Sequence, residues 1–184
     1  MDDVNVLVTF YSRYGSTERL AVWIAEGAVQ AGAKIRLRRA RDLAPEEVVH
    51  QVPEWKENRD RMQKEYAAPT EADAKWADAI ILGTPCRFGA VSAELKAYLD
   101  SLDTLWSEGK LNGKVGSAFT SSYAPQLGSE STLLSMYQVM AHLGLTMMPI
   151  GRFNRDPAAE PFELAHLQGK TVTQIARALR AAGT

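Results

Sequence analysis

Five short apolar segments alternate with segments of helical periodicity along this chain, and this alternation constrains the fold more than any other feature. A strand pattern followed by a helix pattern, repeated, is typical of a parallel sheet covered by helices on both faces. The expected strands span residues 5–11, 34–41, 78–84, 114–121 and 145–150. The first expected helix follows the loop at residues 12–17 and ends at Gly32, and the later ones span residues 92–105, 131–143 and 163–182.

The segment between the second and third expected strands is less regular. Residues 45–75 contain Pro53, Pro69, Trp55 and many charged side chains. We expect a partly helical excursion there, ending in a helix over residues 71–76. Because the chain has 184 residues and no evident linker, it is expected to form one α/β domain over residues 1–184.

Composition narrows the function classes. A net charge of −1 and a pI of about 6.3 fit neither a nucleic-acid-binding polycation nor a strongly acidic electron carrier. Cys86 is the only cysteine, which excludes an internal disulfide, and no cluster of His, Cys and carboxylates predicts a metal site. The N-terminal residues show no signal peptide and no membrane span is visible, so we expect a cytoplasmic protein without membrane or nucleic-acid partners.

A basic run lies in the second expected strand. It consists of Arg36, Arg38, Arg39 and Arg41, which alternate in part with apolar residues. Side chains of neighbouring strand residues point to opposite faces, so Arg38 and Arg39 cannot belong to one basic stripe. We interpret the run as the solvent face of an edge strand rather than a nucleic-acid site.

The loop between the first strand and the first helix has the composition of an anion site. It reads Ser12, Arg13, Tyr14, Gly15, Ser16 and Thr17. The free amides at a helix start attract anions, the hydroxyls add donors, and glycine lets the backbone come close to a ligand. The P-loop and dinucleotide motifs are both missing, so a monophosphate fits best. A helix capped by Ser or Thr without any ligand is the alternative.

Two more loops follow expected strands at the edge where open α/β sheets bind ligands. The first contains Pro85, Cys86, Arg87, Phe88 and Gly89. Its backbone N–H groups, which begin after Pro85, could bond the polar edge of a planar ring. The second is long and polar and contains Ser121, Ser122, Tyr123 and Gln126. The alternative for the first of these is an ordinary Pro/Gly turn, and for the second a structural loop. The three loops together strengthen the prediction of a ligand site at this edge.

In several stretches the chain resembles the WrbA-type NAD(P)H:quinone oxidoreductases of the flavodoxin-like superfamily. The stretches are residues 6–17, residues 77–89 with Gly-Thr-Pro-Cys-Arg-Phe-Gly as the most specific part, residues 105–114, and residues 142–151. They run in order along nearly the whole chain. The resemblance implies a flavodoxin-like three-layer sandwich with a five-stranded parallel sheet of order 2-1-3-4-5 and helices on both faces.

The resemblance also implies the cofactor and the reaction. The phosphate of flavin mononucleotide (FMN) would lie in the loop at residues 12–17 and its ring against the other two loops. Trp106 would help to wall the flavin, of its own chain or of a neighbouring subunit in a homotetramer, and His142 would contact quinone or nicotinamide. Packing for Trp106 and a helix C-terminal role for His142 are the structural alternatives. The expected activity is a two-electron, ping-pong transfer from NAD(P)H through FMN to a quinone.

The chain departs from the family at three places. Cys86 stands where Thr is common, the loop at residues 121–129 lacks the usual run of glycines, and residues 151–161 replace a longer insertion. These differences affect the substrate side and subunit contacts. They do not affect the phosphate loop directly. Three other functions also stay open: a flavodoxin-type one-electron carrier, an FMN-dependent regulatory or binding protein, and a homologue that has lost FMN.

Overall fold

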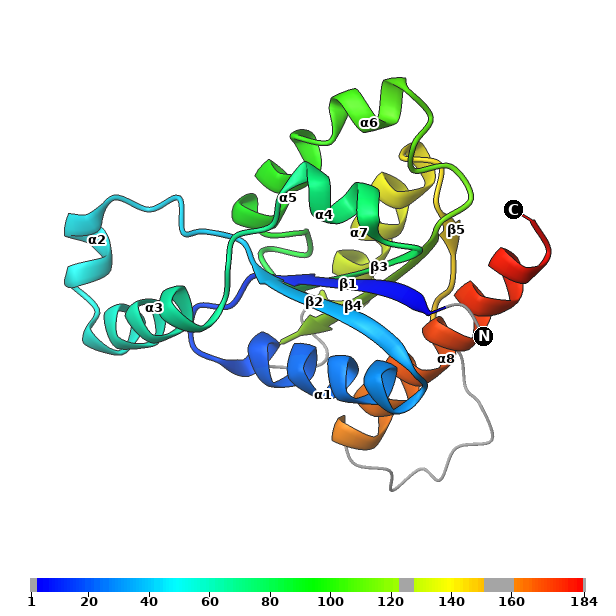
Figure 1. Cartoon of the computed structure of the whole chain (residues 1–184). Coiled ribbons are helices and arrows are strands. Elements are labelled where there is room, and N and C mark those ends of the chain that lie inside the picture. The colour runs from blue at the N-terminus through cyan, green and yellow to red at the C-terminus, as the bar shows by residue number, and fades with distance from the viewer. Residues whose placement is uncertain (1–2, 123–127, 151–160, 184) are drawn as a thin grey trace.

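The strands of the computed structural model, which describes residues 3–122, 128–150 and 161–183, form one parallel sheet (Figure 1). Their order is β2-β1-β3-β4-β5, which confirms the order expected from the family resemblance. The bounds are β1 Val4–Phe10, β2 Ala33–Arg39, β3 Ala79–Pro85, β4 Val115–Ser121 and β5 Thr146–Met147. The central strands are buried on both faces, as their continuous apolar sequences require.

Helices cover both faces of this sheet (Figure 1). On one face α1 (Ser16–Gln30) and α8 (Pro161–Ala181) share a core with residues such as Val6 and Val8. The other face carries α4 (Glu71–Trp76), α5 (Ala93–Asp100), α6 (Asp103–Ser107) and α7 (Ser129–His142). The two remaining helices, α2 (Glu46–His50) and α3 (Pro53–Glu65), extend beyond the sheet at the end where β1 meets the loop before α1.

Two elements differ from the sequence expectation. The strand expected at residues 145–150 covers only Thr146–Met147, and its last ladder bond runs from the Met148 amide to the Gly116 carbonyl at 2.7 Å. Pro149 follows and has no amide hydrogen to donate, which explains the early end. The helix expected over residues 92–105 is two helices, because the chain turns at Ser101, whose hydroxyl donates to the Tyr98 carbonyl at 2.7 Å.

The arginine run of β2 is not a uniform solvent face. Arg36 and Arg38 both donate to the Asp73 carboxylate of α4, at 3.0–3.1 Å. The side chain of Arg39 is only 2% exposed, so the interpretation of this residue as part of a solvent face is wrong. It points under the loop that precedes α1, where it has polar partners described below. None of the described helices is long and apolar enough to span a membrane.

Candidate functional site

A cavity of about 280 Å³ lies beyond the carboxyl ends of β1, β3 and β4. Because parallel strands end at the same edge of the sheet, this is the position at which open α/β folds collect ligand-binding loops. Ten of the residues selected from the sequence line it: Ser12, Arg13, Tyr14, Ser16, Thr17, Pro85, Cys86, Arg87, Ser121 and Ser122. The structure thus brings all three loops together, while Tyr123 and Gln126 lie outside the described residues.

The first loop places the start of α1 at this cavity. Gly15 is the N-cap of α1, and its φ of 88° is a left-handed conformation that favours glycine. Its amide donates to the Ser12 hydroxyl at 3.0 Å, which closes the turn. Within the described residues, the amides of Ser16, Thr17 and Glu18 have no protein acceptor, as is normal in a first helical turn. Such a turn can bind an anion.

The second loop is a two-residue hairpin. Arg87 and Ala90 exchange both backbone hydrogen bonds, at 3.2 and 3.0 Å, across Phe88 and Gly89. Both tip residues have positive φ, 52° and 76°, a geometry that usually selects Asn-Gly. The Phe88 side chain is fully exposed rather than lining the cavity. A bulky residue in this region of φ carries backbone strain.

The second and third loops are joined directly. The Cys86 amide donates to the Ser121 carbonyl at 2.9 Å, which extends the β3–β4 pairing into the loops. The hydroxyl oxygens of Ser121 and Thr17 lie 2.7 Å apart, so the third loop also contacts the start of α1. The three loops therefore form one hydrogen-bonded rim around the cavity.

Trp106 and His142 lie elsewhere. Both line a separate hollow of about 260 Å³ between α5, α6 and α7. Trp106 precedes β4, and His142 ends α7 just before β5, so both belong to the amino-terminal edge of the sheet. The seven residues of β4 span about 20 Å at 3.3 Å per residue, which separates this edge from the cavity. Within one chain these two residues do not reach the three loops.

Comparisons with known proteins agree with this geometry. The family model described as NADPH-dependent FMN reductase matches residues 5–160. The chain belongs to this FMN reductase family. It is 36% identical to an NAD(P)H dehydrogenase (quinone) 3 of Rhizobium meliloti, over 95% of this chain and 93% of the relative. A protein named NAD(P)H dehydrogenase (quinone) from Azorhizobium caulinodans is 41% identical over 78% of this chain and 69% of its own length.

Solved structures place this FMN reductase chain among flavodoxin-like folds. A WrbA-like flavodoxin from Agrobacterium tumefaciens superposes with a TM-score of 0.66 at 25% identity, covering 96% of this chain and 99% of that one. A flavodoxin from the domain Archaea gives a TM-score of 0.64 at 16% identity, over 95% and 99% of the two chains, and supports the fold alone. The resemblance to WrbA-type proteins is confirmed.

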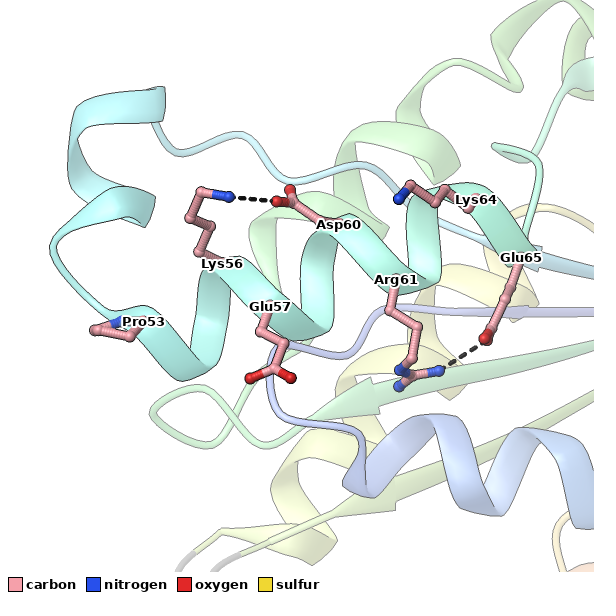
Figure 2. A pocket seen from close by; sticks show the side chains of 7 residues that line it. All are labelled: Pro53, Lys56, Glu57, Asp60, Arg61, Lys64 and Glu65. Carbon is pink, nitrogen blue, oxygen red and sulfur yellow. Dashed lines mark hydrogen bonds and ion pairs between the residues drawn. The ribbon is translucent and has the colours of Figure 1, made fainter.

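A larger hollow of about 530 Å³ on the FMN reductase chain holds none of the residues selected from the sequence. Figure 2 shows that all of its lining side chains come from α3. Two ion pairs run along this helix, Lys56 with Asp60 at 2.6 Å and Arg61 with Glu65 at 2.7 Å. Paired charges on one helix describe a solvated face rather than a ligand site. Among the described residues, no group of three or more His, Cys, Asp or Glu side chains could hold a metal ion.

Sequence reasoning misses three residues behind the first loop of this FMN reductase chain. Arg39 and Trp55 both donate hydrogen bonds to the Asp42 carboxylate. Arg39 also donates to the Ser12 carbonyl, and the Trp55 ring lies under the Arg13 guanidinium. The strand pattern assigns Arg39 to the solvent face, and Trp55 belongs to the irregular excursion. The sequence does contain one indication of this role. Arg39 lies at the carboxyl end of its strand, at the same edge of the sheet as the loops that line the cavity.

Proposed function

We propose that this chain is a single-domain, FMN-dependent NAD(P)H:quinone oxidoreductase of the cytoplasm. The observation that carries the proposal is the cavity in which the first α1 amides, which have no acceptor in the described part of the chain, meet the loops after β3 and β4. The names of the relatives, NAD(P)H dehydrogenase (quinone), support the same activity. FMN, when bound, supplies two-electron redox chemistry between nicotinamide and quinone.

The residues of the cavity fit the phosphate of FMN. The α1 amides and the hydroxyls of Ser16 and Thr17 would donate to phosphate oxygens, and the positive end of the helix dipole would favour the negative charge. No carboxylate lines this cavity among the described residues. Within the same part of the chain, the Glu18 carboxylate beside the loop is engaged by Arg61 through two bonds of 2.7 and 2.6 Å, which offsets its charge.

The loops after β3 and β4 fit the flavin ring. In the described part of the hairpin, the amides of Phe88 and Gly89 have no protein acceptor and would donate to the polar edge of the ring. Such fixed donors stabilise negative charge without reorganising, in the manner of an oxyanion hole. Pro85, Cys86 and Arg87 would lie along the ring because they line the cavity wall.

We further propose that Trp106 and His142 act from a neighbouring subunit, in a homotetramer of the kind that the WrbA resemblance implies. Trp106 is a largely exposed aromatic side chain that shares one hollow with His142. That hollow opens at the edge of the sheet opposite the cavity, so a second copy is the geometric route by which these side chains could approach a flavin. There Trp106 would exclude water and His142 would hold a hydrogen bond to a quinone oxygen.

The first test of the proposal is anaerobic reduction. We expect NADH or NADPH to bleach the FMN-loaded protein without quinone, and benzoquinone to restore the colour. Initial rates should give parallel double-reciprocal lines, because a single cavity must release the nicotinamide before quinone enters. A protein that neither nicotinamide bleaches would instead be a carrier of flavodoxin type, and intersecting lines would contradict the two separate half-reactions.

A charge placed at the start of α1 tests the phosphate site. We expect Ser16→Asp to weaken FMN binding at least about 100-fold relative to Ser16→Asn, since like charges about 4 Å apart repel by about 4 kcal/mol at an effective dielectric of 20. The melting temperature should not fall, because a carboxylate in the first helical turn stabilises the helix. Fluorescence titration with FMN measures both affinities. Equal affinities of the two variants for FMN would indicate that the phosphate does not bind at the start of α1.

A further inference from the structure

An ion pair is buried beneath the loop that leads into α1, and the proposed chemistry does not use it. The Arg39 guanidinium and the Asp42 carboxylate are 2% and 4% exposed, and their nitrogen and oxygen lie 2.7 Å apart. Removing two charges from water is so unfavourable that a buried pair seldom stabilises a fold more than apolar side chains would. The pair therefore calls for an explanation other than stability.

Arg39 connects this pair to the phosphate loop. Its Nη2 atom donates to the Ser12 carbonyl at 3.1 Å as well as to Asp42. The Ser12 hydroxyl in turn accepts from the Gly15 amide at 3.0 Å. A continuous chain of polar contacts thus runs from Asp42 through Arg39 and Ser12 to the N-cap of α1. This chain ends at the residue from which the α1 amides begin.

Asp42 also holds the other side of the loop. Its Oδ1 atom accepts from the Tyr11 hydroxyl at 2.8 Å and from the Trp55 indole at 2.9 Å. The Arg13 guanidinium lies over the ring of Trp55, 3.7 Å from its centroid. Burial alone would raise the pKa of Asp42, but donation from Arg39, Trp55 and Tyr11 outweighs it and keeps the pKa below its ordinary value.

We propose that Arg39 and Asp42 are positioning residues that hold the loop at residues 12–17 in the shape that binds the FMN phosphate. The inference rests on the proposed function, because it concerns the same phosphate site. A loop that is already ordered loses less conformational freedom on binding, and this preorganisation appears as affinity. Two consecutive loop residues, Ser12 and Arg13, are held by groups that converge on Asp42.

Riboflavin separates this role from a merely structural one, because it has the flavin ring but no phosphate. We expect Asp42→Asn to raise the dissociation constant for FMN at least about tenfold, the order expected when a charge-assisted hydrogen bond is lost. The amide that replaces one carboxylate oxygen would oppose the donor of Arg39. The dissociation constant for riboflavin should change less than about twofold, since the other two loops are not touched.

Asp60→Asn is the matched control. It removes a carboxylate that pairs with Lys56 and Arg59 of its own helix and lines the α3 hollow rather than the cavity. Both flavins should bind this variant as they bind the unchanged protein. Arg39→Lys is a milder second variant that keeps the charge beside Asp42, and it should lower the preference for FMN over riboflavin even where Asp42→Asn does not fold.

Three results would overturn the inference, and one of them concerns the proposed function itself. Parallel losses of FMN and riboflavin affinity in Asp42→Asn and Arg39→Lys would indicate a structural role. Unchanged FMN affinity in folded variants would show that the pair does not position the loop. An unchanged protein that binds FMN no more tightly than riboflavin would contradict the phosphate site, and the inference would fail with it.

Discussion

We expect Gly169→Ala to lower the free energy of unfolding by about 3 kcal/mol, at the upper end of the usual cost of overpacking. A Cβ atom added to Gly169 would lie 1.9 Å from the Ile24 carbonyl oxygen and 2.8 Å from the Ala28 amide nitrogen. These are backbone atoms of α1 and cannot rotate away, so the two helices must separate. Gly27 of α1 is in the reciprocal position, where an added Cβ would lie 2.0 Å from the His166 carbonyl oxygen.

Urea denaturation of the purified protein measures this effect. Lys170→Ala is the matched control, because it introduces the same residue at the next, exposed position of α8. Its denaturation midpoint should stay close to that of the unchanged protein, since alanine is also a good helix former. A Gly169→Ala midpoint equal to that of the control would mean that α1 and α8 can move apart without loss, against the close packing described here.

The fold could be predicted largely from local sequence patterns, because buried strands need apolar runs and surface helices need apolar stripes. The failures occur where a single contact overrides a pattern. Pro149 ends the pairing of β5 although the apolar run continues, and the turn at Ser101 divides a continuous helical pattern. Neither effect is visible in hydrophobic periodicity, since one depends on an amide hydrogen that Pro149 lacks and the other on a hydrogen bond from the Ser101 hydroxyl.

The three loops of the candidate site could be predicted from the sequence, because the carboxyl ends of parallel strands lie at the same edge of the sheet. The hydroxyls and Gly15 of the first loop mark an anion site in the sequence, and the cavity brings them to the loops after β3 and β4. The support beneath the loop was not predictable, because alternation assigns Arg39 to a face without reporting what covers that face. Its partners Asp42 and the Ser12 carbonyl lie outside the strand, so its environment is set by three-dimensional contacts.

Trp106 and His142 show a second kind of limit. The family resemblance assigns both to the flavin, yet they precede β4 and β5, and the length of β4 separates them from the cavity within one chain. If they serve a flavin, each complete site contains parts of two chains. Two inactive variants with different defects should then restore one another, and this is the largest change in activity that we expect.

The experiment combines two variants. Ser16→Asp prevents phosphate binding in the first loop, and the double variant Trp106→Ala/His142→Ala removes the two side chains at the amino-terminal edge of the sheet. We expect the quinone reductase activity of each variant alone, at limiting FMN and quinone, to be lower than that of the unchanged protein by about 100-fold or more. Co-expressed in equal amounts, they should recover about a quarter of the activity, because half of the loops and half of the edges are intact and pair at random in a symmetric assembly. The control is a mixture of the two variants that are expressed and assembled separately and then combined under conditions without subunit exchange.

The recovered fraction decides between the two arrangements. If loop and edge served the same flavin within one chain, no mixed assembly could contain an intact site, and the activity would stay at the level of the parents. Recovery therefore requires the edge of one copy to cover the cavity of another. This arrangement is expected because β4, about 20 Å long, separates the edge from the cavity within one chain. A mixture as inactive as its parents, with mixed assemblies demonstrated by mass, would remove Trp106 and His142 from the proposed site and leave the three loops of the cavity to perform the reaction alone.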